Sequence, residues 1–206
     1  MSDYVVIGGP LASGKTTLAW HLAGQTGAKL LAERFSDHPI IEDFYMDPKR
    51  YALQAEMIFT IMHYHDIAKA TKDGDFNGAV VSDLFFDGVE AYTGYTLAPG
   101  DRDPFMKLFR PLQARAPVPS IVVYLDASTE FLMDRVKWRG RKYEMPITFE
   151  YLDGVNTAFK EFIKTYRRAP TITVDAEKLY AMGAEHAAKV LDDIISERAI
   201  RLKQQD

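Results

Sequence analysis

The sequence predicts an α/β fold of three layers, in which a five-stranded parallel sheet lies between two layers of helices. Two observations support this prediction. Short β-branched and apolar runs alternate with longer segments of helical periodicity, and three of the runs are almost continuously apolar, as expected for strands covered on both faces. Helical segments between the runs also favour parallel pairing, because two parallel strands need a long crossover connection.

The elements follow one another in the order that such a fold requires. The final helical pattern has the clearest period, with Ala187, Leu191 and Ile194 on one face and Asp192 and Glu197 off it. The predicted strands are Tyr4–Ile7, Lys29–Leu31, Ala79–Ser82, Ile121–Leu125 and Ile172–Val174.

Two connections stand out because of their glycine, proline or arginine content. Residues 87–104 contain three glycines and two prolines. We therefore expect an irregular insertion or long loop near the mouth of the site. Residues 138–146 contain Arg139-Gly140-Arg141 between two helical patterns, and we expect a short arginine-rich lid there.

Composition limits the class of protein. The chain has 206 residues, 47% of them hydrophobic and 26% charged, which predicts one globular domain over residues 1–206. A net charge of −4 argues against bulk binding of nucleic acid. The chain contains no cysteine, which excludes disulfides and thiolate metal sites and fits a cytoplasmic location. We expect no membrane span and no secretory leader.

The segment Gly9–Thr16 matches the phosphate-binding pattern G-x-x-x-x-G-K-T. It lies between a predicted strand and a predicted helix, which is the context that the motif requires. Lys15 would reach the outer phosphates of a nucleotide, and the Thr16 hydroxyl would bind Mg²⁺. The alternative is a glycine-rich turn with a chance lysine. The predicted nucleotide-binding residues of this loop are Gly9, Ala12, Ser13, Gly14, Lys15, Thr16 and Thr17.

Two carboxylates follow predicted strands. Glu33 comes just after the second strand and Asp83 just after the third. The carboxyl ends of parallel strands meet at one edge of a sheet, where the phosphate-binding loop also lies. One carboxylate can take a proton from an attacking hydroxyl and the other can hold magnesium. The alternative for either is a solvated loop acid or a helix cap.

The helix expected to start near Pro48 carries a polar stripe. Glu56, Thr60 and His63 recur at helical spacing on an otherwise apolar segment, so we expect them to face a cleft. The alternative is a Glu56–His63 pair satisfied inside the core. The remaining histidines have no partner at metal-ligand spacing and are expected on the surface or in packing.

Three arginines lie along and just after the helix that begins near Ser128, namely Arg135, Arg139 and Arg141. Guanidinium groups on a mobile segment can close over a triphosphate and stabilise the charge of a transferring phosphoryl group. A solvated basic turn is the alternative.

With these residues placed, the chain resembles the deoxyribonucleoside kinases, a family of P-loop kinases. The resemblance runs from Val5 to about Tyr166. It rests on the P-loop, Glu33, Val80-Val81-Ser82-Asp83, Arg139-Gly140-Arg141 with Glu144, and the specific segment Phe44-Tyr45-Met46-Asp47-Pro48-Lys49-Arg50-Tyr51. It implies a P-loop kinase fold that uses ATP and Mg²⁺ to phosphorylate the 5′-hydroxyl of a deoxynucleoside or a similar acceptor.

The resemblance also implies residue roles. Glu33 would be the general base, Lys15 and Arg139 would act on the phosphates, and Asp83 with Thr16 would hold magnesium. Arg135 and Arg141 would bind the donor nucleotide, and Tyr45 with Glu144 would hold the sugar 3′-hydroxyl.

Three positions depart from the family pattern. Leu84 stands where the family has an arginine, and we expect Arg102 or Arg110 to replace it in space. Glu56 and His63 stand where the family has glutamine and arginine in contact with the base. An ionised carboxylate only accepts hydrogen bonds, so Glu56 would favour an edge with two donors, such as that of guanine. Alternatively, Gln54 takes over this role.

Other functions stay open at this point. A nucleoside monophosphate kinase would need cations for the acceptor phosphate, and Arg50, Arg102 and Lys107 are available. A nucleotide-binding homologue that no longer catalyses is the other alternative, motivated by Leu84. The family resemblance also implies a homodimer joined by helices.

Overall fold

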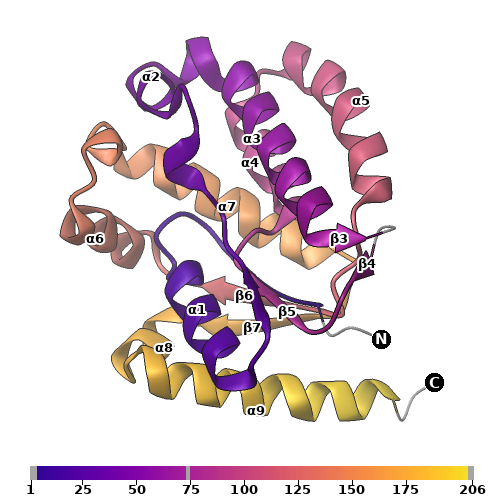
Figure 1. Ribbon diagram of the computed structural model, residues 1–206. Coiled ribbons are helices and arrows are strands. Elements are labelled where there is room, and N and C mark those ends of the chain that lie inside the picture. Colours follow the sequence, from indigo (N-terminus) through magenta and orange to yellow (C-terminus); the bar gives the residue numbers. More distant parts are fainter. Residues whose placement is uncertain (1–3, 73–74, 204–206) are drawn as a thin grey trace.

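A parallel sheet forms the centre of the molecule. The computed structural model describes residues 4–72 and 75–203, so residues 1–3, 73–74 and 204–206 of the predicted domain lie outside the described residues. The strand order is β2-β5-β1-β6-β7, and every pairing between neighbours is parallel (Figure 1). The strands are β1 (Tyr4–Gly8), β2 (Lys29–Leu31), β5 (Val80–Ser82), β6 (Ile121–Asp126) and β7 (Thr171–Asp175). The predicted five-stranded parallel sheet is therefore confirmed, with each strand within one residue of its expected bounds.

Helices cover both faces of this sheet, which confirms the three-layer prediction (Figure 1). Alternate side chains of β1 enter different clusters: Val5 and Ile7 pack on the side of α1 and α9, whereas Tyr4 and Val6 pack with α7. One face is covered by α1 (Lys15–Thr26), α8 (Ala176–Ala181) and α9 (Ala184–Lys203), and the other by α3 (Pro48–Ala70), α4 (Val89–Thr96), α5 (Pro99–Arg115) and α7 (Phe149–Thr165).

The long helix α3 begins where the sequence predicts. The Asp47 side chain accepts a hydrogen bond from the Arg50 N–H, and Pro48 occupies the first turn, where its missing N–H costs nothing. A short helix, α2 (Ile41–Met46), precedes it. Polar residues interrupt the apolar faces of the long helices, and no helix among the described residues is long and apolar enough to cross a bilayer.

The prediction of an irregular segment at residues 87–104 is wrong. After a 3₁₀ turn (Phe86–Gly88), the chain forms α4 and then α5. Pro99 lies in the first turn of α5, where proline is tolerated. Pro104 does lie inside the helix, but Phe105 and Phe109 are fully buried on the same helix. Their burial outweighs the lost backbone hydrogen bond.

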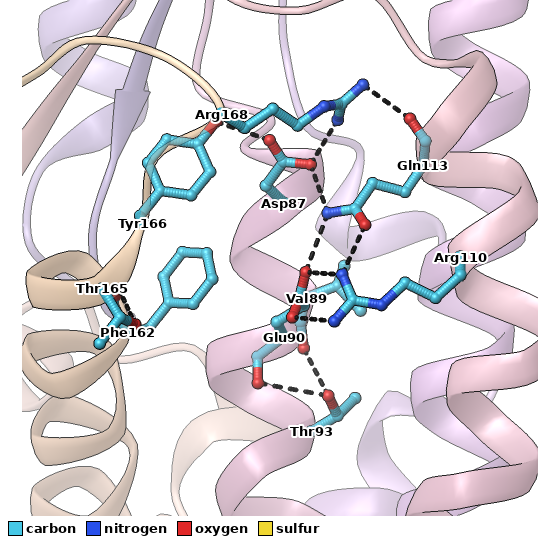
Figure 2. A network of polar contacts seen from close by, with 10 residues as sticks. All are labelled: Asp87, Val89, Glu90, Thr93, Arg110, Gln113, Phe162, Thr165, Tyr166 and Arg168. Carbon is cyan, nitrogen blue, oxygen red and sulfur yellow. Dashed lines mark hydrogen bonds and ion pairs between the residues drawn. The ribbon is translucent and has the colours of Figure 1, made fainter.

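A buried polar network fixes the amino end of α4 (Figure 2). Asp87 is 2% exposed and accepts hydrogen bonds from the Tyr166 hydroxyl, the Arg168 guanidinium and the Gln113 amide. Arg168 also donates to backbone carbonyls at the end of α5. The network therefore ties α4 and α5 to the connection between α7 and β7.

The remaining elements are short. The helix α6 (Thr129–Arg139) ends at Gly140, whose φ of 60° favours glycine. The predicted lid segment follows and contains a 3₁₀ turn (Lys142–Glu144). Another 3₁₀ turn (Phe35–Asp37) follows β2. A hairpin of β3 (Thr71–Lys72) and β4 (Asp75–Phe76), which the sequence did not predict, extends from α3.

Candidate active site

The turn between β1 and α1 has the backbone of a phosphate-binding loop. Gly9 and Gly14 have φ values of 149° and 100°, and a Cβ on Gly9 would lie 2.9 Å from the Ser13 hydroxyl oxygen. No side chain caps α1, so the N–H groups of its first turn remain available to an anion. Lys15 Nζ donates to the Pro10 carbonyl at 2.9 Å and so spans the loop.

A cavity of about 340 Å³ opens beside this loop. Four cationic side chains contribute to its wall, one from the loop and three from α6 and the lid segment, so it suits a polyanion. Gly9 and Ser13 lie in the loop behind the wall rather than on it. The lining residues are Leu11, Ala12, Gly14, Lys15, Thr16, Thr17, Glu33, Phe35, Ser36, Arg135, Trp138, Arg139, Arg141 and Tyr143.

A second, more apolar cavity of about 50 Å³ adjoins the first. The two cavities share Leu11, Lys15, Glu33 and Phe35, so they meet at the lysine and the carboxylate. Lys15 and Glu33 therefore face both a cationic cavity and a more apolar one. The second cavity is lined by Leu11, Lys15, Glu33, Phe35, Phe44, Tyr45, Glu56, Phe59, His63, Val89, Tyr92 and Tyr151.

Glu33 is held at both its backbone and its side chain. Its N–H donates to Asp83 Oδ1 at 2.7 Å, and its Oε1 lies 2.9 Å from His63 Nε2. Burial raises the pKa of Glu33, but the hydrogen bond and charge of His63, together with the charge of Lys15, outweigh burial and leave the pKa below its ordinary value. Glu33 is therefore ionised at neutral pH and able to accept a proton.

Asp83 is 1% exposed and lines neither cavity, but it contacts Thr16, which lines the first. The Thr16 hydroxyl donates to Asp83 Oδ2 at 2.5 Å. Burial raises the pKa of Asp83, and the hydrogen bonds from Thr16 and Glu33 partly offset that effect. Among the described residues, no group of three or more His, Asp or Glu side chains is placed to hold a metal. A hydroxyl and one carboxylate beside a phosphate site nevertheless fit Mg²⁺, which takes few protein ligands and completes its shell with phosphates and water.

Lys15 lies between the two acidic groups. Burial lowers the pKa of Lys15, whereas the charges of Glu33 and Asp83 raise it, and burial prevails. A buried lysine beside an anion site interacts strongly with phosphate because little water screens its charge.

The polar stripe of α3 faces the second cavity, as predicted for Glu56 and His63. Glu56 is 5% exposed, and its Oε1 accepts a hydrogen bond from the Thr96 hydroxyl at 2.7 Å. Burial raises the pKa of Glu56 to about 7, although the Thr96 hydrogen bond opposes this change. Thr60 is fully buried, and its hydroxyl donates to the Glu56 carbonyl.

Two expectations about this stripe are wrong. The alternative Glu56–His63 pair does not form, because His63 contacts Glu33 and Glu56 contacts Thr96. Gln54 is exposed and lines neither cavity, since it lies two residues before Glu56 and so points away from that face of α3.

The three predicted lid arginines all line the first cavity. Arg135 donates to the Ala12 carbonyl at 3.2 Å and lies over the Tyr180 ring, with 4.3 Å between the guanidinium carbon and the ring centroid. Arg139 makes two short hydrogen bonds to Glu144, at 2.5 and 2.6 Å. Arg141 is the most loosely held, 3.6 Å from Glu144.

The predicted sugar-binding pair lies on two elements that contact each other, α2 and the 3₁₀ turn Lys142–Glu144. Tyr45 is buried and lines the second cavity. Glu144 is 1% exposed, is occupied by Arg139 and lines neither cavity. Burial raises the pKa of Tyr45, and the charge of Glu144 contributes to that rise.

The expected replacement of the arginine missing at Leu84 is also wrong. Leu84 is fully buried in the hydrophobic core. Arg110 forms a bidentate ion pair with Glu90 on α4, at 2.6 and 2.9 Å (Figure 2). Neither it nor Arg102 lines either of the two cavities, and the same holds for Arg50 and Lys107.

Sequence reasoning missed four aromatic side chains of the second cavity's wall, and Thr96 behind it. The side chains concerned come from four separate segments, so no local motif unites them. Only their aromatic character was a usable signal, because aromatic residues often line ligand pockets. The missed residues are Phe35, Phe59, Tyr92, Tyr151 and the Glu56 partner Thr96.

Comparison with known proteins gives one family. A family model described as deoxynucleoside kinase matches residues 5–199. Deoxyguanosine kinase of Bacillus subtilis (strain 168) is 29% identical over 175 residues, which cover 84% of this chain and 84% of that protein. Deoxyadenosine kinase of Dictyostelium discoideum is 28% identical over 176 residues, covering 84% of this chain and 71% of that protein.

The fold is also that of a solved member. The structure of deoxyadenosine kinase from M. mycoides with bound dATP superposes with a TM-score of 0.81, at 20% sequence identity. The match covers 94% of this chain and 99% of that chain.

Proposed function

The chain belongs to the deoxynucleoside kinase family, and from that premise we propose that it transfers the γ-phosphoryl group of ATP to the 5′-hydroxyl of a deoxynucleoside. The observation that carries this proposal is the meeting of the cationic first cavity and the apolar second cavity at Lys15 and Glu33. The triphosphate would lie in the first cavity and the deoxynucleoside in the second.

The donor side would work mainly through positioning and charge. The loop N–H groups and Lys15 would hold the β- and γ-phosphates, while Arg135, Arg139 and Arg141 would neutralise charge from the opposite wall. Thr16 and Asp83 would hold Mg²⁺, which, when bound, neutralises phosphate charge. No bond to a protein atom is needed, because the two substrates react directly.

The acceptor side would supply the general base. Glu33 is ionised at neutral pH, since its pKa is lowered, and lies at the junction of the cavities. It would accept the proton of the 5′-hydroxyl as the oxygen forms its bond to the γ-phosphorus and the bond from that phosphorus to ADP breaks.

Recognition of the nucleoside base would differ from that in relatives that have glutamine at the position of Glu56. Tyr45, Phe59 and Tyr92 provide aromatic walls, and the buried Glu56 provides the polar end. With its pKa raised to about 7, Glu56 is partly ionised at neutral pH. Guanine, whose N1–H and amino group present two donors, would favour the ionised form, which only accepts hydrogen bonds. The second cavity is smaller than the roughly 300–1,000 Å³ of typical ligand sites, so side chains would move as the nucleoside enters.

The two alternative functions receive less support. A monophosphate kinase needs cations around the acceptor phosphate, but Arg50, Arg102 and Lys107 line neither cavity. A non-catalytic role is motivated by Leu84, yet Lys15, Thr16, Glu33 and Asp83 lie together as catalysis would require.

Product analysis tests the proposed function. The protein is incubated with ATP, Mg²⁺ and, separately, deoxyguanosine, deoxyadenosine, deoxycytidine, thymidine or dGMP. We expect deoxynucleoside 5′-monophosphates, formed fastest from deoxyguanosine. Phosphorylation of dGMP alone would favour a monophosphate kinase. ATP binding without any transfer across the panel would favour the non-catalytic role, and an absent guanine preference would overturn the assignment of Glu56.

We also propose a cytoplasmic homodimer. The lack of cysteine fits a reducing compartment. Ile61 on α3 and Leu108 on α5 expose 51% and 37% of their surface on neighbouring helices, which supports an interface there. Sedimentation of the protein and of an Ile61→Glu variant tests the dimer, because the variant is expected to sediment as a monomer.

A further inference from the structure

We propose that His63 is a positioning residue that holds the Glu33 carboxylate toward the incoming hydroxyl, rather than a residue that contacts the base of the nucleoside. This inference rests on the proposed function, since Glu33 needs an orientation only if it acts as a base. It gives a specific role to a position that lies deep in the second cavity.

The contact itself is direct and well enclosed. His63 Nε2 lies 2.9 Å from Glu33 Oε1, and the two side chains are 11% and 22% exposed. A carboxylate is an acceptor, so Nε2 carries the hydrogen and donates it. The nitrogen nearest to Glu33 is therefore committed to that carboxylate and is not available to a base.

The backbone of Glu33 does not need His63. Its N–H is already fixed by Asp83 Oδ1, at the carboxyl end of the sheet. What remains free is the side chain, which has three rotatable bonds. His63 projects from a 23-residue helix capped by Asp47, so its ring is a rigid support for those torsions.

Lys15 explains why the Glu33 side chain needs His63 to hold it. Its charge acts on Glu33, and it lines both cavities beside the carboxylate. Without His63, the charge of Lys15 would still attract the Glu33 carboxylate, and Glu33 would turn toward it. That rotation would move the base away from the acceptor and occupy the lysine that serves the phosphates.

The other polar group of the stripe has a separate partner. Glu56 accepts from Thr96 and His63 contacts Glu33, so the two residues that stand where the family has glutamine and arginine have different partners. His63 Nδ1 is buried with no hydrogen-bond partner among the described residues. The ring is thus held by the Glu33 contact and by packing on Phe59, with 5.8 Å between ring centroids.

Steady-state kinetics of three variants test the role. His63→Leu keeps the bulk of the ring and removes the donor. His63→Gln restores an N–H donor at about the same reach, and His65→Ala, an exposed position on the same helix, is the control. We expect His63→Leu to lower kcat roughly 10- to 100-fold for every deoxynucleoside, with KM changed less than about 3-fold. His63→Gln should recover most of the loss, and His65→Ala should match the wild type.

Other results would overturn the inference. A change in KM or in the ratio of guanine to adenine turnover, with kcat preserved, would assign His63 to the base. An unchanged kcat in His63→Leu, in a preparation whose wild type is active, would refute the positioning role while leaving the kinase function intact. A wild type without transferase activity would instead refute the proposed function.

A measurement that does not depend on enzyme activity separates the positioning role of His63 from the proposed kinase function. In ¹⁵N-histidine NMR spectra, we expect His63 to carry its proton on Nε2 and this signal to shift in Glu33→Ala. The same signal should stay in place in Glu144→Gln, since Glu144 contacts Arg139 instead. If the chemical shift of His63 Nε2 is the same in Glu33→Ala as in the wild type, the contact on which the inference depends is contradicted.

Discussion

At the scale of single residues, Glu56 has the most unusual environment in the acceptor cavity. It is a carboxylate that is 5% exposed, with one hydroxyl donor from Thr96 and no cation in hydrogen-bond contact among the described residues. The charge of His63 lowers the pKa of Glu56, while burial and the charge of Glu56 raise the pKa values of Tyr92 and Tyr151. Burial therefore dominates and favours the neutral acid.

This environment predicts how stability depends on pH. The pKa of Glu56 rises from 4.5 to about 7 on folding, so the folded state holds this proton more tightly than the unfolded state. The free energy of unfolding should therefore fall as pH rises from about 4.5 to 7, by on the order of 3 kcal/mol, and then level off. Glu56→Gln lacks this dependence, so the variant should gain stability over the wild type as the pH rises through this range.

Urea denaturation at pH 5 and pH 8 measures the effect. Thr96→Val is a useful second variant, because it removes the donor that favours the charged form and should enlarge the loss of stability at pH 8. A difference between Glu56→Gln and the wild type that stays the same at both pH values would contradict the burial argument.

At the scale of elements, α4 is held at its amino end by buried charge. Asp87 is 2% exposed and pairs with Arg168, and Tyr166 and Gln113 complete its hydrogen bonds (Figure 2). Because α4 carries Tyr92 and Thr96, this network also fixes one wall of the acceptor cavity.

Removing one member of the buried pair should be costly. Asp87→Ala leaves the Arg168 guanidinium without its carboxylate, and we expect a loss of about 3–5 kcal/mol in unfolding free energy. Arg110→Ala breaks an ion pair in the same network, but Arg110 is 56% exposed, so the expected loss is below about 1 kcal/mol. Chemical denaturation of both variants compares them, and similar losses would show that burial does not govern this network.

The contact between α4 and α7 depends on a glycine. A Cβ on Gly154 would lie 1.9 Å from the Tyr95 ring, whose hydroxyl donates to the Glu150 carbonyl. Gly154→Ala should displace this half-exposed ring and lower the melting temperature, at a cost of about 1–3 kcal/mol.

A matched glycine should respond in the opposite direction. Gly24 lies in α1, where an added Cβ would meet no atom within 4 Å beyond its chain neighbours and the nearby helix backbone, so Gly24→Ala should stabilise the protein by about 0.5–1 kcal/mol. Calorimetry of the two variants checks the pair. A Gly154→Ala protein as stable as Gly24→Ala would mean that the close approach of Tyr95 is unimportant.

At the scale of the whole molecule, the sequence predicts those structural elements that depend on a local sequence pattern. The five strands, the phosphate-binding loop and the start of α3 follow from apolar runs, a glycine-lysine motif and Pro48. The clustering of Lys15, Glu33 and Asp83 also follows, because parallel strands bring their carboxyl ends to one edge.

What the sequence does not predict depends on long-range packing. Residues 87–104 form α4 and the start of α5 despite their glycines and prolines, and the burial of Phe105 and Phe109 anchors α5. The pairing of His63 with Glu33 joins residues 30 positions apart and cannot be seen in either local pattern. The same holds for Thr96 and Glu56, which are 40 positions apart.

The central claim is that the phosphoryl group crosses from one cavity to the other at Glu33. The most direct test compares the wild type with Glu33→Gln and measures how fast each forms deoxyguanosine 5′-monophosphate from ATP and deoxyguanosine. Followed by ³¹P NMR at saturating substrates, the wild type should form the monophosphate. The variant, which keeps the size of the side chain but cannot accept the proton, should be slower by roughly 10²- to 10⁴-fold while still binding ATP. A variant that turns over as fast as the wild type would contradict the account.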